Sequence, residues 1–183
     1  MKKTHPTSIF LIALAIIFSA LTGTPANAGE KGYRYWGYFQ APAGAKTWTM
    51  AMTGPSVVVP DGSVEGWAFT FSSESVPDAA TPHRAPNFKR ICGTTKSPGA
   101  NMKRIGVIID FGRAVLRPKG ESMPRTVFKC VVVDNGAIGF DVLAKVVKIR
   151  AAASGFVCAF NNYPAKECGA EIPTPASLIP KKQ

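Results

Sequence analysis

The chain has 183 residues, of which 46% are hydrophobic and 18% charged, and its formal net charge is +11. This is the length of one ordinary domain, which can bury a core without a metal or a partner chain. The positive charge favours contact with anionic surfaces such as wall polymers or lipid head groups, although an aid to solubility explains it equally well. Because the positive residues are scattered and an export signal is present, we expect no nucleic-acid partner.

The N-terminal segment has the parts of a secretory signal peptide. A short basic start is followed by an apolar run over 9–18 and by Ala26-Asn27-Ala28, the small-residue pattern that a signal peptidase reads. A transmembrane helix needs about 20 apolar residues, so the alternative of an uncleaved membrane anchor is disfavoured. We therefore expect a signal peptide over 1–28 and a secreted, extracellular protein, free or associated with the cell surface.

The first part of the mature chain is typical of β-strands. Segment 33–39 is dense in aromatic residues, and segments 48–53 and 67–72 alternate large apolar with small or polar residues. A period of two indicates strands with one buried face. Pro60-Asp61-Gly62 is a turn in which proline presets one dihedral angle and glycine accepts a positive one. These features predict an antiparallel meander.

The second part of the chain adds a central strand and a helix. A loop over 73–100, with at most a short helix, precedes the nearly continuous apolar run 104–111, which is typical of a strand covered on both faces. After a further strand at 127–133, apolar residues four apart over 137–148 predict an amphipathic helix. A last strand at 155–160 follows. The fold class expected is α+β, with a mainly antiparallel sheet and one substantial helix.

The domain boundaries follow from these elements. A single domain is expected over 29–170, held together by disulfides. The tail over 171–183 contains three prolines and two lysines, a composition that predicts disorder.

Four cysteines, Cys92, Cys130, Cys158 and Cys168, lie in the mature chain. An even number in an exported chain indicates disulfides, and four cysteines allow three pairings. The segment between Cys158 and Cys168 is rich in turn residues, so its ends can meet, which suggests the pairs Cys158–Cys168 and Cys92–Cys130. A zinc site is disfavoured because the mature chain has no C-x-x-C pattern and one histidine. No metal site and no cofactor are expected.

The chain offers few catalytic residues. His83 is the only histidine of the mature chain and lies in a loop beside Arg84, where an exposed structural position is the simpler interpretation. Four carboxylates, Asp61, Glu65, Asp110 and Asp134, are available for acid–base work such as glycoside cleavage, but turn and surface roles explain them as well. We therefore expect that the protein is not an enzyme.

The aromatic residues concentrated near residue 35 are the candidate binding site. Tyr33, Tyr35 and Trp36 are expected to stack on a flat or saccharide-like ligand, with Arg34 supplying a charged hydrogen bond. Burial of these rings in the sheet core is the alternative.

Several segments of the chain resemble a family of exported actinobacterial proteins of unknown function. The resemblance runs from about Tyr33 to Gly169 and is carried by Tyr33-Arg34-Tyr35-Trp36, the stretch 60–67, Phe88 to Cys92, 107–112 and 155–158. Members of that family tend to be encoded beside energy-coupling-factor type vitamin or cobalt transporter genes, often with a protein carrying helical repeats. The resemblance therefore implies an accessory role in nutrient capture outside the membrane.

A weaker similarity concerns 131–137 followed by 141–143, which looks like the strand–turn–helix unit of ligand-binding β-grasp domains. Some of those domains bind cobalamin. Three hypotheses result. The first is a binding protein that captures a small-molecule nutrient, a corrinoid before others, alone or with a helical-repeat partner protein. The second is a cell-wall-associated structural or interaction protein that binds anionic wall polymer, and an enzyme is the third.

Overall fold

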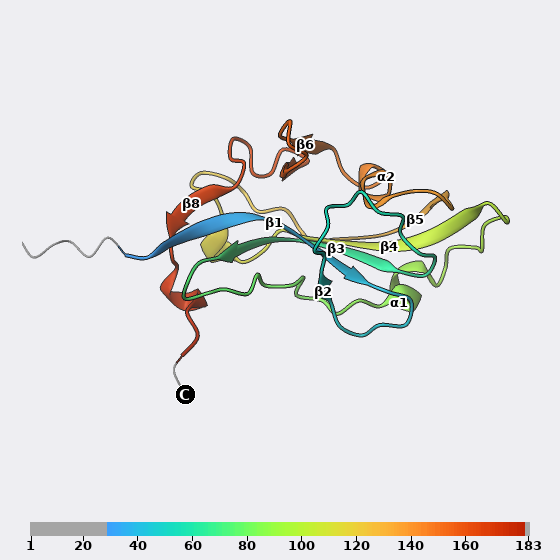
Figure 1. Cartoon of the computed structure of the whole chain (residues 1–183), viewed down its shortest axis with the longest axis horizontal. Coiled ribbons are helices and arrows are strands. Elements are labelled where there is room, and N and C mark those ends of the chain that lie inside the picture. Colours follow the sequence, from blue (N-terminus) through green and yellow to red (C-terminus); the bar gives the residue numbers. More distant parts are fainter. Residues whose placement is uncertain (1–28, 182–183) are drawn as a thin grey trace, which may run out of the picture.

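The computed structural model describes residues 29–181, so the signal peptide expected over 1–28 lies outside the described residues. A six-stranded sheet forms the body of the molecule (Figure 1). The strands are β1 (Lys31–Ala41), β2 (Thr49–Met50), β3 (Val64–Ser72), β4 (Met102–Asp110), β5 (Val127–Asp134) and β8 (Ala170–Pro173). Their order is β2-β1-β3-β4-β5, with β8 paired to the other end of the same edge of β1.

The pairing of the sheet is mixed rather than purely antiparallel. Strands β1 and β3 are antiparallel, as are β4 and β5, but β3 and β4 run parallel. Parallel neighbours need a long crossover, and here the segment 73–101 supplies it. The expected antiparallel pairing of the first strands is confirmed. The meander is wrong, because β2 and β3 lie on opposite sides of β1.

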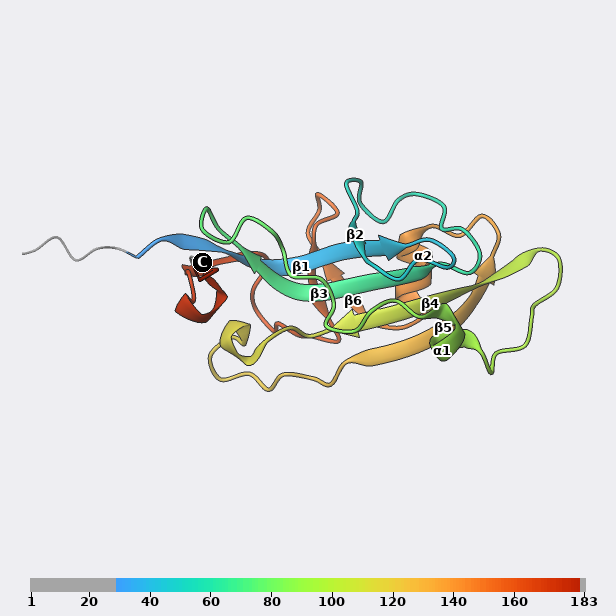
Figure 2. The ribbon, with the colours of Figure 1, turned by 90° about the horizontal axis from the view of Figure 1, so that it is seen from below.

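Both faces of the sheet carry further segments (Figures 1 and 2), which place β3 and most of β4 between two layers, whereas β5 at the sheet edge is largely exposed. One face carries α2 (Gly139–Ala144) and the two-stranded sheet of β6 (Ile149–Ala151) and β7 (Val157–Phe160). The other face carries the crossover with α1 (Phe88–Cys92). The main core lies under α2 and β7, where Trp67, Phe160 and Val142 are at most 2% exposed. The predicted central strand is confirmed as β4, which is buried over most of its length.

The α+β class is confirmed, but the expected substantial helix over 137–148 is not. Helix α2 has six residues, and its C-cap at Lys145 leads through a turn into β6. Asp141 accepts a hydrogen bond from the backbone N–H of Ile138 at 3.0 Å, and so caps the start of the helix. Val147 is buried although it lies outside the helix, so the apolar spacing reflects a buried turn as well as a helical face. In the β-grasp resemblance a helix packs across a sheet, and a helix as short as α2 lends no support to that resemblance.

The tail over 171–183 is expected to be disordered, but the part that the structure describes, to residue 181, contains regular elements. Ala170–Pro173 forms β8 on the free edge of β1, and Lys31 donates a hydrogen bond to Glu171 at 3.0 Å. Proline is compatible with such an edge strand because only one side of the strand needs its N–H groups. A single 3-10 turn, η2 (Ala176–Leu178), follows.

Both expected disulfides are present, Cys92–Cys130 and Cys158–Cys168. The first fastens α1 to β5 across the sheet edge, and the second joins β7 to the segment before β8. Disulfides persist in oxidising compartments, which agrees with the expected location outside the cytosol. Within residues 29–181 there is no helix of sufficient length and hydrophobicity to cross a membrane.

Candidate functional site

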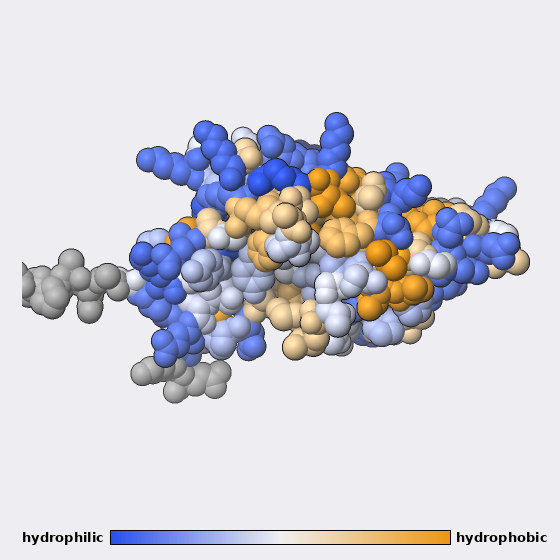
Figure 3. All heavy atoms as spheres, turned by 45° about the horizontal axis from the view of Figure 1, so that its top comes forward, coloured by the Kyte–Doolittle hydropathy of each residue, from blue (hydrophilic) through white to orange (hydrophobic). Residues whose placement is uncertain are grey.

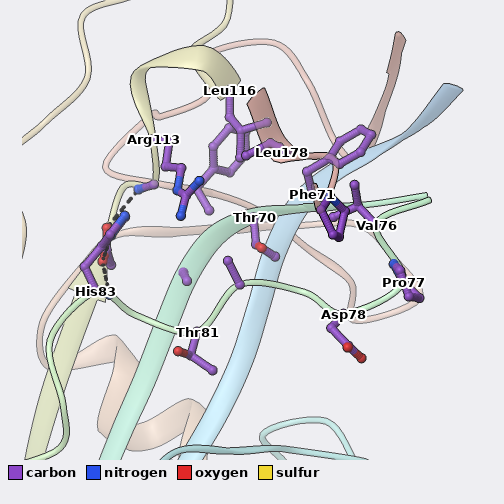
Figure 4. Close-up of a pocket in the computed structure, with 16 residues that line it drawn as sticks. Thr70, Phe71, Val76, Pro77, Asp78, Thr81, His83, Arg113, Leu116 and Leu178 are labelled. Carbon is purple, nitrogen blue, oxygen red and sulfur yellow. Dashed lines mark hydrogen bonds and ion pairs between the residues drawn. The ribbon is translucent and has the colours of Figure 1, made fainter. Parts of the chain in front are cut away.

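A cavity of about 230 Å³ lies at one end of β3 and β4, on the face covered by the crossover (Figure 4). Residues from the sheet, the crossover, the segment after β4 and the C-terminal segment form its walls. The polar side chains among them are those of Thr70, Asp78, Thr81, His83, Asp110 and Arg113. The larger apolar ones are Phe69, Phe71, Val76, Leu116 and Leu178.

The polar end of the cavity is built on Asp110, the last residue of β4. Asp110 is 3% exposed, and its carboxylate accepts hydrogen bonds from three N–H groups. His83 lies against one oxygen, with its backbone nitrogen 2.7 Å and its Nδ1 2.6 Å from Oδ2, while the backbone N–H of Gly112 donates to Oδ1 at 2.9 Å. A buried carboxylate is tolerated when several donors surround it, so Asp110 anchors the crossover to the strand end.

Gly112 makes this anchor possible. Its φ is +85°, a value that favours glycine, and a Cβ there would lie 2.2 Å from the carbonyl oxygen of Phe69. The chain therefore turns sharply after β4 and points the Gly112 N–H at Asp110. The turn also places Arg113 on the His83 side of the cavity (Figure 4).

The contact with Asp110 fixes the tautomer of His83. A carboxylate only accepts hydrogen bonds, so Nδ1 carries the proton and Nε2 stays free. The side chain of His83 is 51% exposed, so this free edge is open to a ligand. Arg113 is also exposed, and no ion pair or side-chain hydrogen bond to it occurs within residues 29–181.

The floor of the cavity contains a polar group without a partner in the described part of the chain. Thr70, on β3, is 1% exposed, and its hydroxyl makes no hydrogen bond. Leaving such a group unpaired costs about 1–3 kcal/mol, so native structures usually pair it with protein, water or ligand. Thr70 lies between the polar end with His83 and the apolar end with Phe71 and Val76 (Figure 4). The cavity is therefore amphipathic from one end to the other.

The side chains of the cavity can contact both a polar and an apolar part of a ligand. Among the described residues that line it, none is a serine or a cysteine that the His83–Asp110 pair could activate. No group of three His, Cys, Asp or Glu residues able to hold a metal ion occurs in the part of the chain that the structure describes. The residues present offer a guanidinium, a free imidazole edge, a buried hydroxyl and an apolar wall.

The structure does not bring the four predicted site residues together, because successive side chains of a strand alternate between its faces. Trp36 is 4% exposed in the main core, so little of its ring is accessible to a ligand. Arg34 is paired with Glu167 through two hydrogen bonds and also donates to the Leu116 carbonyl at 3.1 Å. Three of its five N–H groups are thus used within the protein.

The other two predicted residues lie apart from that pair. Tyr33 is 54% exposed, and Tyr35 is half-buried with its hydroxyl 3.3 Å from the hydroxyl of Ser72. Neither lines the cavity beside His83. The predicted aromatic site is thus not one surface.

A second hollow, of about 290 Å³, lies on the opposite face between the segment 50–55 and the tip of the β6–β7 hairpin. Trp36, Tyr38 and Trp67 form its floor, and Met52 and Phe156 are exposed at its rim. Figure 3 shows apolar side chains gathered on the side of the molecule that carries α2 and β6.

A buried acidic group lies beside this second hollow. Glu65 is 2% exposed, accepts a hydrogen bond from the Tyr38 hydroxyl, and burial raises its pKa to about 7. Gln40 donates to the same hydroxyl at 2.9 Å, and burial, followed by the charge of Glu65, raises the pKa of Tyr38. Burial also lowers the pKa of Lys103, whose ammonium donates to the carbonyls of Asn135 and Ala137.

Sequence reasoning missed the assembly of the cavity. It considered His83 and Asp110 separately, as a loop residue and a strand end, and nothing in the sequence indicated a contact across their sequence separation of 27. The one usable signal is Asp110-Phe111-Gly112 after a buried strand, since an Asx turn with a required glycine commonly presents a carboxylate at such an end.

The fold and the cavity define a disulfide-linked α+β domain with a mixed sheet and one amphipathic cavity at a strand end. The chain belongs to the SCO2322-like domain family, whose model matches residues 28–173. No curated protein matches the chain, and no solved structure does.

Proposed function

We propose that this protein is an exported accessory binding protein that captures a small-molecule nutrient in the cavity beside His83 and works with an energy-coupling-factor type transporter. The observation that carries the binding role is the buried Thr70 hydroxyl, which lacks a protein partner at the floor of an amphipathic cavity. Ligand sites combine such an apolar lining with a few well-placed polar groups. The signal-peptide pattern, the two disulfides and the resemblance noted above support the exported, accessory part of the proposal.

The size of the cavity restricts how a corrinoid would bind. A cavity of about 150 Å³ holds one benzene molecule, so about 230 Å³ accommodates a single substituted ring rather than a macrocycle. A corrinoid would therefore insert one peripheral group and leave its ring system outside. It remains the first ligand to test.

Binding without turnover is part of the proposal. The imidazole of His83 is held by Asp110 as in hydrolytic triads, but the described lining contains no serine or cysteine that could serve as the third member. Turnover of a substrate that is lost on changing one Asp or Glu would contradict this part.

A second candidate function, binding of anionic wall polymer, is favoured by the surface charge. The chain has 22 Lys and Arg residues, and within 29–181 only Lys31 and Arg34 form ion pairs with carboxylates. Positive side chains without partners attract polyanions in a salt-dependent way. Salt-sensitive retention on cell-wall material, without binding of small molecules, would favour this function.

The test is thermal unfolding of the oxidised chain from Gly29 onward with cobalamin, cobinamide, other vitamins and soluble wall fragments. A ligand at 100 times its Kd adds about 2.7 kcal/mol, which raises the Tm of a domain of this size by several degrees. Such a shift with a nutrient supports the proposal. The absence of any shift, also after addition of the helical-repeat partner protein, would overturn it.

A further inference from the structure

We propose that the ligand of the cavity beside His83 is a small organic carboxylate whose carboxylate group binds Arg113 and Thr70 and whose apolar part is about one ring in size. This inference rests on the proposed binding function and names the chemical class of the ligand. It follows from the charges, the unpaired groups and the volume of the cavity.

The polar end carries one positive and one negative side chain, Arg113 and Asp110, which differ in their access to a ligand. Asp110 is negative, but its carboxylate is occupied by the three N–H groups of His83 and Gly112 and lies beneath them, 3% exposed. The guanidinium of Arg113 is exposed and is not paired with a carboxylate in the described range. The other acidic residue of the lining, Asp78, lies beyond Thr70 on the side away from His83 and Arg113 (Figure 4). An anionic group is therefore attracted to the end with Arg113.

The unpaired donors at that end suit a carboxylate. A guanidinium matches the two oxygens of a planar carboxylate, and the Thr70 hydroxyl donates a further hydrogen bond while gaining the partner it lacks. A phosphate monoester, which carries more negative charge, would need more positive partners than this end provides.

The opposite end of the cavity determines the rest of the ligand. Phe71 and Val76 lie at this end, whereas Leu116 lies on the Arg113 side (Figure 4). Together with Leu178 they provide an apolar lining, and the volume of about 230 Å³ leaves room for one ring beyond the carboxylate. The cavity would bury that ring and form a charged hydrogen bond with the carboxylate of the ligand. It would therefore bind an amphipathic acid more tightly than neutral or cationic molecules of equal size.

The test compares benzoate, benzamide and benzamidine, which share one shape and differ in charge. Each is titrated at millimolar concentrations and matched ionic strength into the oxidised chain from Gly29 onward, and Kd is obtained from amide chemical shifts, with Gly112 as the reporter of the site. We expect benzoate to bind at least tenfold more tightly than benzamide, because a charged hydrogen bond adds about 1.5–3 kcal/mol. Benzamidine should bind most weakly.

Variants locate the binding to the named groups. Arg113→Gln should reduce the preference for benzoate over benzamide to less than about threefold, while Arg125→Gln, an exposed arginine outside the cavity, should leave it unchanged. Thr70→Val retains the shape and should weaken benzoate binding several-fold.

The outcomes separate this inference from the proposed function. Equal or tighter binding of benzamide or benzamidine, or a benzoate preference that survives Arg113→Gln, would overturn the carboxylate class and leave a binding protein with a different ligand. Binding of none of the three probes would overturn it too, and a nutrient that raises the Tm would then still support the proposed function.

Discussion

The most unusual single residue of the core is Glu65, a carboxyl group that is 2% exposed in the middle of an apolar cluster. Burial raises its pKa to about 7 from an ordinary value of 4.5, against the opposing effects of Tyr38, Gln40 and Lys103. Between these two pH values the folded state binds more protons than the unfolded state. The stability contributed by this group is therefore fully present below about pH 4.5 and is lost as the pH rises toward 7.

Replacing Glu65 by Gln should remove this loss. The amide keeps an acceptor for the Tyr38 hydroxyl and cannot ionise, so Glu65→Gln should be more stable than the wild type above pH 7, by about 2–3 kcal/mol. The difference should shrink toward zero near pH 4.5. Urea unfolding across pH 4.5–8 measures it, with Glu74→Gln, an exposed loop residue, as the control. A variant that is less stable than the wild type at pH 8 would show that the carboxylate is the stabilising form.

Asp110 and His83 differ in what they contribute to the polar end of the cavity. Asp110→Asn replaces one acceptor oxygen by an NH₂ group that faces N–H donors, so we expect a loss of about 1–3 kcal/mol in the free energy of unfolding. His83→Asn keeps a donor near the position of Nδ1 and should cost less than about 1 kcal/mol, since the side chain is half exposed. Equal effects of the two changes on urea unfolding would contradict the anchoring role of Asp110.

Among the elements, the strands were the most predictable. Alternation over 67–72 identifies β3 correctly, and the continuous apolar run over 104–111 identifies β4 as a central strand. The parallel pairing of these two strands was not predictable, because it depends on the path of a crossover that has no periodic pattern of its own. The predicted helix over 137–148 is longer than the observed helix α2. Buried residues of the following turn, such as Val147, continue the helical spacing by coincidence.

The same alternation explains why the four predicted residues do not share one surface, whereas the cavity depends on contacts between distant segments. Arg34 and Trp36 point away from Tyr33 and Tyr35, and the ion pair of Arg34 with Glu167 depends on a loop 133 residues further along the chain. His83 and Thr70 meet in one cavity only because the crossover folds back over β3. Contacts of this kind are set by tertiary structure, and local sequence patterns do not encode them.

The disulfides join different elements, and their removal should have unequal effects. Cys92–Cys130 closes a loop with a sequence separation of 38, and Cys158–Cys168 one of 10, so loop-closure entropy predicts contributions of about 4 and about 3 kcal/mol. Double replacement by alanine should therefore destabilise the chain more for the first pair, which also holds α1 against β5. Urea unfolding of both double variants tests this ranking, and a larger loss for Cys158/Cys168 would contradict it.

At the scale of the whole molecule, the two ends of the described range 29–181 meet at the cavity end of the sheet. Strand β8 pairs with the start of β1, Thr174 donates its N–H to the Glu30 carbonyl at 2.7 Å, and the following segment brings Leu178 and Pro180 to the cavity wall. The C-terminal segment thus belongs to the cavity although η2 contains no buried residue. It should influence ligand binding more than it influences folding.

Removal of residues 175–183 separates these two effects. The truncated chain keeps β8, so its free energy of unfolding should stay within about 1 kcal/mol of that of the chain from Gly29 onward, as expected when no fully buried residue is lost. Loss of the half-buried Leu178 wall should cost about 1 kcal/mol of binding, or roughly fivefold in the Kd for benzoate. Leu178→Ala should reproduce most of that effect, and Ile179→Ala, an exposed neighbour outside the lining, should not. If truncation unfolds the chain, or leaves the Kd unchanged, the C-terminal segment is not the wall of a binding cavity but a structural strap or a bystander.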